Sequence, residues 1–172
     1  MDLITALAIS IGVLGGLATF VFLSPVGLGL YIWAAFIAWG SFYHCGGKVS
    51  GLKASLLANL WGVLWAALTL LAISRTGLAD SLGLPLWAGI CVAIGVALMI
   101  LGSKIPDLSS IPAAVYGYAA TVAAVLLANA MGAIATPDLN NPVITVALSM
   151  VIGGFLGLAS EHLAGILAKP KN

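Results

Sequence analysis

Long runs of apolar residues dominate this chain, and nearly every charge lies between two of them. Each run is long enough to cross about 30 Å of hydrocarbon, which takes roughly 20 helical residues. Because a helix satisfies its own backbone hydrogen bonds, the pattern predicts an all-helical protein with six membrane-spanning helices. The predicted spans are Leu3–Leu23, Leu28–His44, Ala54–Ile73, Leu82–Leu101, Ile111–Met131 and Val143–Ala168.

The composition requires a lipid bilayer as the main solvent of this protein. Of its 172 residues 62% are hydrophobic and 6% are charged, whereas soluble domains carry about 25% charged residues. A net charge of +1 without a Lys/Arg stripe excludes nucleic acid as a partner. We therefore treat residues 1–172 as a single six-helix membrane domain.

Boundary residues support the predicted helix starts. Ser109-Ser110 precede Pro112, and Asn140-Asn141 precede Pro142. Ser and Asn cap helix N-termini, and proline suits a first turn because the amide that it lacks would have no partner there.

The basic residues predict the orientation of the chain. With six spans, one side of the membrane holds both termini and five of the six basic residues, and the other side holds Arg75 alone. The five are Lys48, Lys53, Lys104, Lys169 and Lys171. Cytoplasmic loops are enriched in Lys and Arg, so we expect both termini in the cytoplasm. The N-terminus also lacks the basic region of a signal peptide, so we expect the first span to be retained.

An internal repeat relates the two halves. A shift of 79 residues aligns the first two predicted helices with the fourth and fifth, with eight identities among the 34 pairs that begin at Ile9. A shift of 91 residues aligns the third helix with the sixth. Each unit, residues 3–73 and 82–168, holds three helices, an odd number, so the units would enter the membrane from opposite sides. The pattern indicates an inverted repeat, as in transporters and channels; the alternative is two unrelated halves rich in small residues.

Small residues recur every four positions on three of the predicted helices, so they share one helix face, and on the sixth helix this stripe is partly polar and ends at Glu161. These stripes are Gly12 and Gly16; Ala54, Ala58, Gly62 and Ala66; and Thr145, Ser149, Gly153, Gly157 and Glu161. Such stripes usually let membrane helices pack closely, which is the favoured reading, and a partly polar pore wall that includes Ser149 is the alternative.

The segment "SFYHCGGK", residues 41–48, places a histidine beside a cysteine. His44 and Cys45 are neighbours, so on a helix they point about 100° apart and cannot easily bind one ligand. Gly46-Gly47 and Lys48 instead indicate the cytoplasmic end of the second helix. We expect no metal, no cofactor and no catalytic residue here.

Glu161 and His162 follow eighteen apolar or small residues and precede Lys169 by about 12 Å of helix. A carboxylate at that depth is costly unless it faces water or a partner. Either the sixth helix leaves the membrane there, or Glu161 faces an aqueous vestibule. His44 lies at the same level, so His44, Glu161 and His162 could approach one another.

Three further residues are candidates for a polar path. Asn59 lies inside the third helix, where a buried amide needs partners or water. Trp39 and Tyr118 correspond under the 79-residue shift and could constrict a central path, or could simply pack in the bundle.

The stretches "WAAFIAWGSFYHCGGKVSGLKASLLANLWGVLWA" and "IPAAVYGYAATVA" resemble the YcdZ-like family of small bacterial inner-membrane proteins of unknown function. The resemblance, together with the six-helix hydropathy, extends over most of the chain. It implies a protein of the bacterial cytoplasmic membrane and brings no activity or catalytic residue.

The sequence favours a passive channel or facilitator for a small polar solute or ion, assembled as a homo-oligomer. Few embedded charges argue against an ion-coupled pump. The alternative is a non-transporting accessory or scaffold protein. An enzyme is not expected, because no HExxH, GxSxG or buried Asp pair is present.

Overall fold

The computed structural model describes residues 1–168, and every regular element in that range is helical. The all-helical prediction is confirmed for these residues, whereas Lys169 and Lys171 of the orientation argument lie outside them. The α-helices are α1 (Leu3–Leu23), α2 (Ile32–His44), α3 (Lys48–Arg75), α4 (Leu78–Leu82), α5 (Leu84–Leu101), α6 (Ile111–Leu127) and α7 (Pro142–Leu167). The short 3-10 turns are η1 (Pro25–Gly27), η2 (Gly102–Lys104), η3 (Pro106–Leu108) and η4 (Met131–Ala133).

Capping side chains mark the starts of α1 and α7, whereas Ser110 at the start of α6 makes no capping hydrogen bond. The Asp2 side chain accepts a hydrogen bond from the amide of Thr5 at the start of α1. Asn141 does the same for the amide of Val143, and Pro142, which directly follows Asn141, is the first residue of α7. α6 begins at Ile111 with Pro112 in its first turn. These two side chains accept from amides that a helix leaves unpaired at its N-terminus, and each proline removes one such amide.

Four helices are long and apolar enough to cross a membrane: α1, α3, α5 extended by η2, and α7. α6 is a shorter apolar helix of 17 residues, and α2 has 13. The prediction of a second helix over Leu28–His44 is wrong at its start. Leu28 and Gly29 have left-handed backbone after η1, so α2 cannot begin until Ile32.

Other predicted boundaries also differ. α3 is longer than Ala54–Ile73, because no residue between Lys48 and Arg75 interrupts it. The predicted Leu82–Leu101 helix is divided at Gly83, whose positive φ separates α4 from α5. The predicted Ile111–Met131 helix ends at Leu127, shortly before the left-handed backbone of Asn129.

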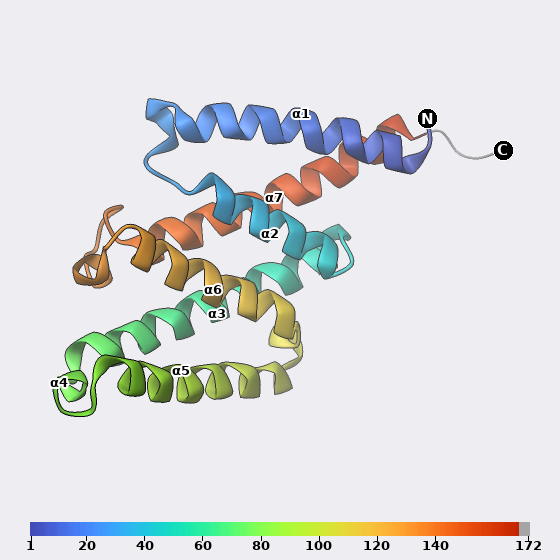
Figure 1. Cartoon of the computed structure of the whole chain (residues 1–172). Coiled ribbons are helices and arrows are strands. Elements are labelled where there is room, and N and C mark those ends of the chain that lie inside the picture. Colours follow the sequence, from blue (N-terminus) through green and yellow to red (C-terminus); the bar gives the residue numbers. More distant parts are fainter. Residues whose placement is uncertain (169–172) are drawn as a thin grey trace.

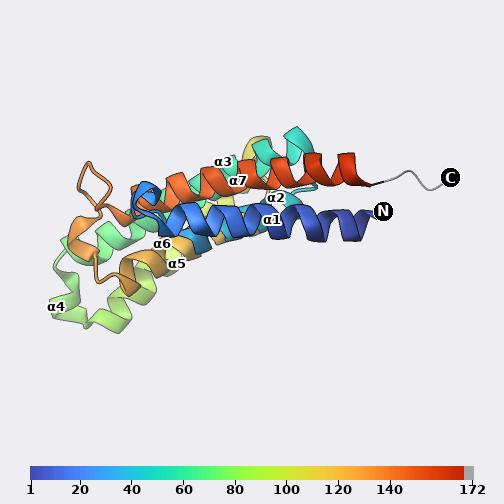
Figure 2. The same ribbon diagram turned by 90° about the horizontal axis from the view of Figure 1, so that it is seen from above.

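Apart from the five-residue α4, which we leave out of the six long helices, successive α-helices run in alternating directions (Figure 1). The start of α1, the α2–α3 turn, the α5–α6 connection and the end of α7 lie at one end of the bundle, which we call the Lys48 end (Figures 1 and 2). The η1 connection, α4 and the α6–α7 connection lie at the other end, the Arg75 end. α1 and α5 form the flanks, and the other four long helices lie between them.

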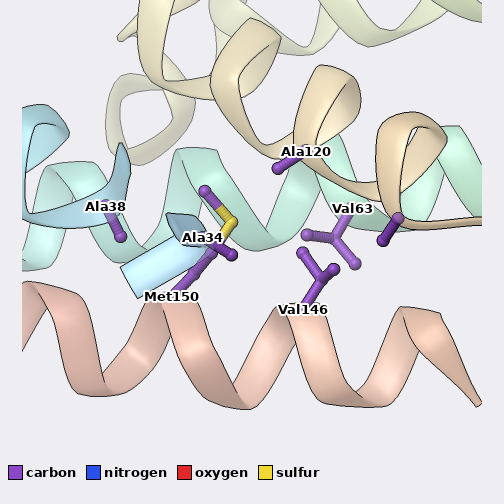
Figure 3. Packing of buried hydrophobic residues seen from close by; sticks show 7 residues of the cluster. Ala34, Ala38, Val63, Ala120, Val146 and Met150 are labelled. Atoms are coloured by element: carbon purple, nitrogen blue, oxygen red, sulfur yellow. The ribbon is translucent and has the colours of Figure 1, made fainter. Parts of the chain in front are cut away.

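The four central helices meet in a core of small and medium-sized side chains. α2 packs mainly on α7, and α3 packs mainly on α6. Figure 3 shows how side chains from all four helices converge. The cluster consists of Ala34, Ala38, Val63, Ala120, Ala124, Val146 and Met150.

Glycines bring the central helices into backbone contact. A β-carbon at Gly62 would overlap the carbonyl oxygen of Ala114, across the α3–α6 contact. One at Gly153 would overlap the carbonyl oxygen of Ala35, across the α7–α2 contact. Small residues permit such approach in membranes, where dispersion contacts replace the hydrophobic effect as the main attraction between helices.

The other predicted packing residues divide into two groups. Ala58 is completely buried, and Gly157 lies against the ring of Phe42. Gly12 and Gly16, in contrast, lie on an exposed face of α1, and a β-carbon at either would meet no atom within 4 Å. No helix of the same chain packs against this Gly12–Gly16 face within the described residues, so its role in helix packing stays a prediction.

We expect Gly153→Leu to prevent normal folding, because its side chain must displace the backbone of α2. Overpacking of a core costs about 1–3 kcal/mol or more. Size-exclusion chromatography after heating in mild detergent should show a melting temperature lowered by several degrees, or no folded protein. Gly89→Leu is the control, because a β-carbon at Gly89 on α5 meets open space. Equal melting temperatures for the two variants would contradict this reading.

Candidate functional site

Asn59 carries the most unusual polar group of the bundle. It is completely buried on α3, and its Oδ1 accepts a hydrogen bond of 3.0 Å from the Ser41 hydroxyl on α2. Its Nδ2 is buried and has no hydrogen-bond partner among residues 1–168. Rotating the side-chain amide by 180° would exchange its nitrogen and its oxygen and would leave the oxygen without a partner instead. An unsatisfied buried polar group costs about 1–3 kcal/mol.

Three helices fix the position of this amide. The tight turn after α2 sends α3 back along α2, which brings Asn59 opposite Ser41. From the other side, α6 approaches so closely that a β-carbon at Gly117 would overlap the carbonyl oxygen of Asn59. α2 thus contacts the side chain of Asn59, and α6 contacts its backbone.

A second polar cluster surrounds Ser160 on α7. Its hydroxyl donates to the carbonyl of Gly157 at 2.8 Å and accepts from the indole N–H of Trp39 at 2.9 Å. The Tyr43 hydroxyl lies 2.7 Å from the same oxygen. Trp39 is therefore held against α7 by a hydrogen bond.

Tyr118, the repeat partner of Trp39, lies on the α5 side of the bundle. It packs with Ala66, Met99 and Ala114. Its buried hydroxyl has no hydrogen-bond partner in the described part of the chain, and its ring borders an apolar cavity of about 260 Å³. Trp39 and Tyr118 thus occupy separate surroundings, and their role in a path stays a prediction.

Glu161 contacts the α2–α3 turn. Its Oε2 accepts a hydrogen bond of 2.7 Å from the backbone amide of Lys48, the first residue of α3. Glu161 is half-buried, and with Lys48 and the exposed His162 it lines an open groove of about 390 Å³. This contact gives the carboxylate a partner that sequence reasoning missed.

His44 does not join Glu161 and His162. Its Nδ1 lies 3.5 Å from the Tyr116 hydroxyl, and the two rings meet edge to face. Cys45 donates instead to the Ser110 hydroxyl at 3.3 Å. Within residues 1–168 no group of three or more His, Cys, Asp or Glu side chains could hold a metal ion.

Ser149 serves the start of α2. Its hydroxyl accepts a hydrogen bond of 2.9 Å from the amide of Tyr31 and donates to the carbonyl of Thr145. Tyr31 is the N-cap residue of α2 and has no capping side chain of its own. Ser149 on α7 therefore satisfies one backbone donor of a neighbouring helix.

An ordered connection closes the Arg75 end between α6 and α7. Ile134 is buried there against Leu70 and Val125. The Asn141 side chain donates to the carbonyls of Ile134 and Thr136 at 3.1 and 2.8 Å.

Farther along the same connection, the Asn140 amide donates to the Asp138 carboxylate. This bond lowers the pKa of Asp138 from its usual value.

Sequence reasoning missed Ser41 and Ser160. Both are hydroxyl residues within apolar helices, where a serine can bond to its own backbone and gives no distinct signal. The repeat gives no sign of Ser41, because Ala120 stands at the equivalent position, and it offers only another hydroxyl residue, Thr69, opposite Ser160.

The apolar helices indicate a helical protein embedded in a membrane. Residues 8–165 match the model of a family described as protein of unknown function (DUF1097). Because the match covers most of the chain, the protein belongs to this family. No curated protein and no solved structure matches the chain. The resemblance to the YcdZ-like family stays a prediction.

Proposed function

We propose that all six long helices cross the membrane as an inverted three-plus-three repeat. α1, α2 and α3 form one unit, and α5, α6 and α7 form the other. The alternating directions of the helices support six crossings (Figure 1). α2 covers only about 20 Å at 1.5 Å per residue, and the non-helical backbone before it completes the crossing. Its amides are hydrogen-bonded within the protein: Leu30 donates to the carbonyl of Gly27, and Tyr31 donates to the Ser149 hydroxyl on α7.

Burial supports the repeat in the central helices. The six buried residues of α2 correspond to buried residues of α6 that lie 79 positions later. Eight of the ten buried residues of α3 correspond to buried residues of α7 that lie 91 positions later. Two unrelated helices of similar composition have no reason to bury the same positions.

The closest backbone contacts also correspond. Gly62 lies on the carbonyl of Ala114, and Gly153 lies on the carbonyl of Ala35. The 91-residue shift relates the two glycines, and the 79-residue shift relates the two alanines. A two-fold axis that exchanges α3 with α7 and α6 with α2 would exchange these two contacts.

The flanking helices depart from this relation. Gly12 and Gly16 on α1 are exposed, whereas their counterparts Cys91 and Gly95 on α5 are buried. α1 packs on α7 and α5 packs on α3, each with its own register. We therefore propose that the repeat aligns the four central helices residue by residue. For α1 and α5 it holds only for their order in the chain and their direction.

We further propose that the protein is a passive channel or facilitator for a small polar solute or ion. The observation that carries this proposal is the unpaired buried amide of Asn59. It lies six residues past Lys53, the last charged residue before it in α3, or about 9 Å along the helix, inside a hydrocarbon layer of about 30 Å. Polar groups at that depth usually belong to a substrate or ion pathway.

A non-transporting accessory or scaffold protein is the second candidate. The backbone contacts at Gly62, Gly117 and Gly153 fill the space between the central helices. A channel with this structure must widen those contacts to conduct, whereas a scaffold needs no passage.

A flux assay separates these functions. Proteoliposomes with the wild-type protein should pass at least one solute of a panel of small polar solutes and ions faster than empty liposomes. Asn59→Leu should lower that flux about tenfold or more, the effect of roughly 1.4 kcal/mol on a barrier. Met150→Leu is the matched control, because Met150 is the apolar, buried counterpart of Asn59.

If no solute exceeds the empty liposomes, the scaffold reading is favoured. If Asn59→Leu conducts like the wild type, Asn59 has no part in the path.

We propose the bacterial cytoplasmic membrane as the location, with the Lys48 end in the cytoplasm. Single cysteines in a protein without its native cysteines test this orientation in whole cells. An impermeant maleimide should label cysteines at the exposed positions Val26, Thr76 and Leu139, which lie at the Arg75 end. A cysteine at Ser109 should react only after permeabilisation. The reverse pattern would overturn the orientation, and labelling of Val26 and Ser109 from the same side would argue against six crossings.

We propose that a second copy of the chain covers the Gly12–Gly16 face of α1. Small residues without a partner in the chain favour close approach of another membrane helix. Gly12→Leu should then lower the fraction of oligomer that is measured by cross-linking in lipid vesicles, without lowering the amount of folded protein. Gly89→Leu, on the exposed face of α5, should leave that fraction unchanged. An unchanged oligomer in Gly12→Leu would exclude this face.

A further inference from the structure

The turn between α2 and α3 has an unusual backbone. Gly46, Gly47 and Lys48 all have positive φ, at 90°, 67° and 58°. Two glycines adopt this left-handed region easily, but Lys48 does so against its usual preference. The turn therefore needs contacts from elsewhere to hold it closed.

The carboxylate of Glu161 supplies such a contact from α7. It accepts a hydrogen bond from the backbone amide of Lys48, which is the first amide of α3. The N-cap residue Gly47 has no side chain that could cap this amide. The positive end of the α3 dipole favours a negative charge at this point. Gly47 makes room for the contact, because a β-carbon there would lie 2.6 Å from Oε1 of Glu161.

The residue equivalent to Glu161 in the first half closes the Arg75 end of the bundle with different chemistry. Leu70 precedes Glu161 by 91 residues, the shift that relates α3 to α7. It packs against Ile134, in the connection that follows α6. In each half, this position therefore contacts the connection between the second and third helices of the other half. The Arg75 end is closed by apolar contact, and the Lys48 end is closed by a charge.

We propose that Glu161 is a positioning residue whose charged carboxylate keeps the α2–α3 turn closed over the Lys48 end of the central helices. Opening the turn would release Phe42 from its contact with Gly157 and would move the neighbouring Ser41 away from Asn59. The role of this contact as the gate of a polar path rests on the function proposed above. Its role in keeping the turn closed does not depend on that function.

Among residues 1–168, few other charged or titratable groups lie near the carboxylate. The Lys48 side chain lies on α3, His162 on α7, and the Tyr43 hydroxyl on α2. Lys48 and His162 are exposed, so water screens their charges. The backbone amide of Lys48 is therefore the main partner of Glu161.

The two native cysteines report whether the turn opens. Cys45 is half-buried at the start of the turn, and Cys91 is buried in α5. In purified protein, Glu161→Leu should raise the maleimide labelling rate of Cys45 about fivefold or more, since a charge-assisted hydrogen bond is lost. Glu161→Gln keeps an acceptor and should give a smaller increase. Cys91 should stay protected, and His162→Gln should label like the wild type.

Trypsin provides a second measurement that does not depend on thiol chemistry. Cleavage after Lys48 should accelerate in Glu161→Leu, while cleavage after Lys104, in the other connection at the same end, should not. An unchanged rate at both Cys45 and Lys48 would overturn the proposal. A joint rise at Cys45 and Cys91 would also overturn it, because Glu161 would then stabilise the whole fold. Neither measurement needs transport, so a failed flux assay leaves their outcome intact.

Discussion

The central helices of this protein approach until their backbones touch, and most of its architecture depends on that approach. Lipid tails are as apolar as leucine, so burial alone does not hold membrane helices together. Gly62 and Gly153 remove the side chains that would keep α3 from α6 and α7 from α2. Dispersion contacts between close backbones then provide the attraction. The exposed apolar surfaces of α1 and α5 remain for lipid or for another protein chain.

Close packing also isolates the polar groups of the interior. Ser149 and Ser160 reach donors on neighbouring helices and form satisfied hydrogen bonds. The Asn59 side chain reaches only Ser41, and its Nδ2 is buried without a partner among the described residues. A bundle built only for packing would gain from an apolar residue at this position, since half of the amide is unsatisfied. The amide therefore argues for a function that uses it.

Sequence patterns predicted the elements well and their contacts poorly. The apolar runs and the prolines at 112 and 142 gave the helices and two of their starts, because both signals act within one helix. The start of α2 differed because the left-handed backbone at Leu28 and Gly29 has no strong signal at a leucine. A small-residue stripe shows that a face can be approached, but not what approaches it, so Gly12 and Gly153 looked alike. The bond from Glu161 to Lys48 joins residues 113 positions apart, which no local pattern reveals.

The proposed repeat separates residues that serve packing from residues that serve chemistry. The two halves bury the same positions in their central helices, yet their polar groups differ. Three polar residues, Ser41, Asn59 and Glu161, form one set, which we call the polar set. The residues at the equivalent positions of the opposite half form the other set and are apolar: Ala120, Met150 and Leu70. Symmetric packing would be served equally well by apolar residues in both sets. The polar set includes both the unpaired amide and the contact that closes the Lys48 end. Function in this protein should therefore depend on the positions at which the two halves differ, and the positions that they share should govern folding.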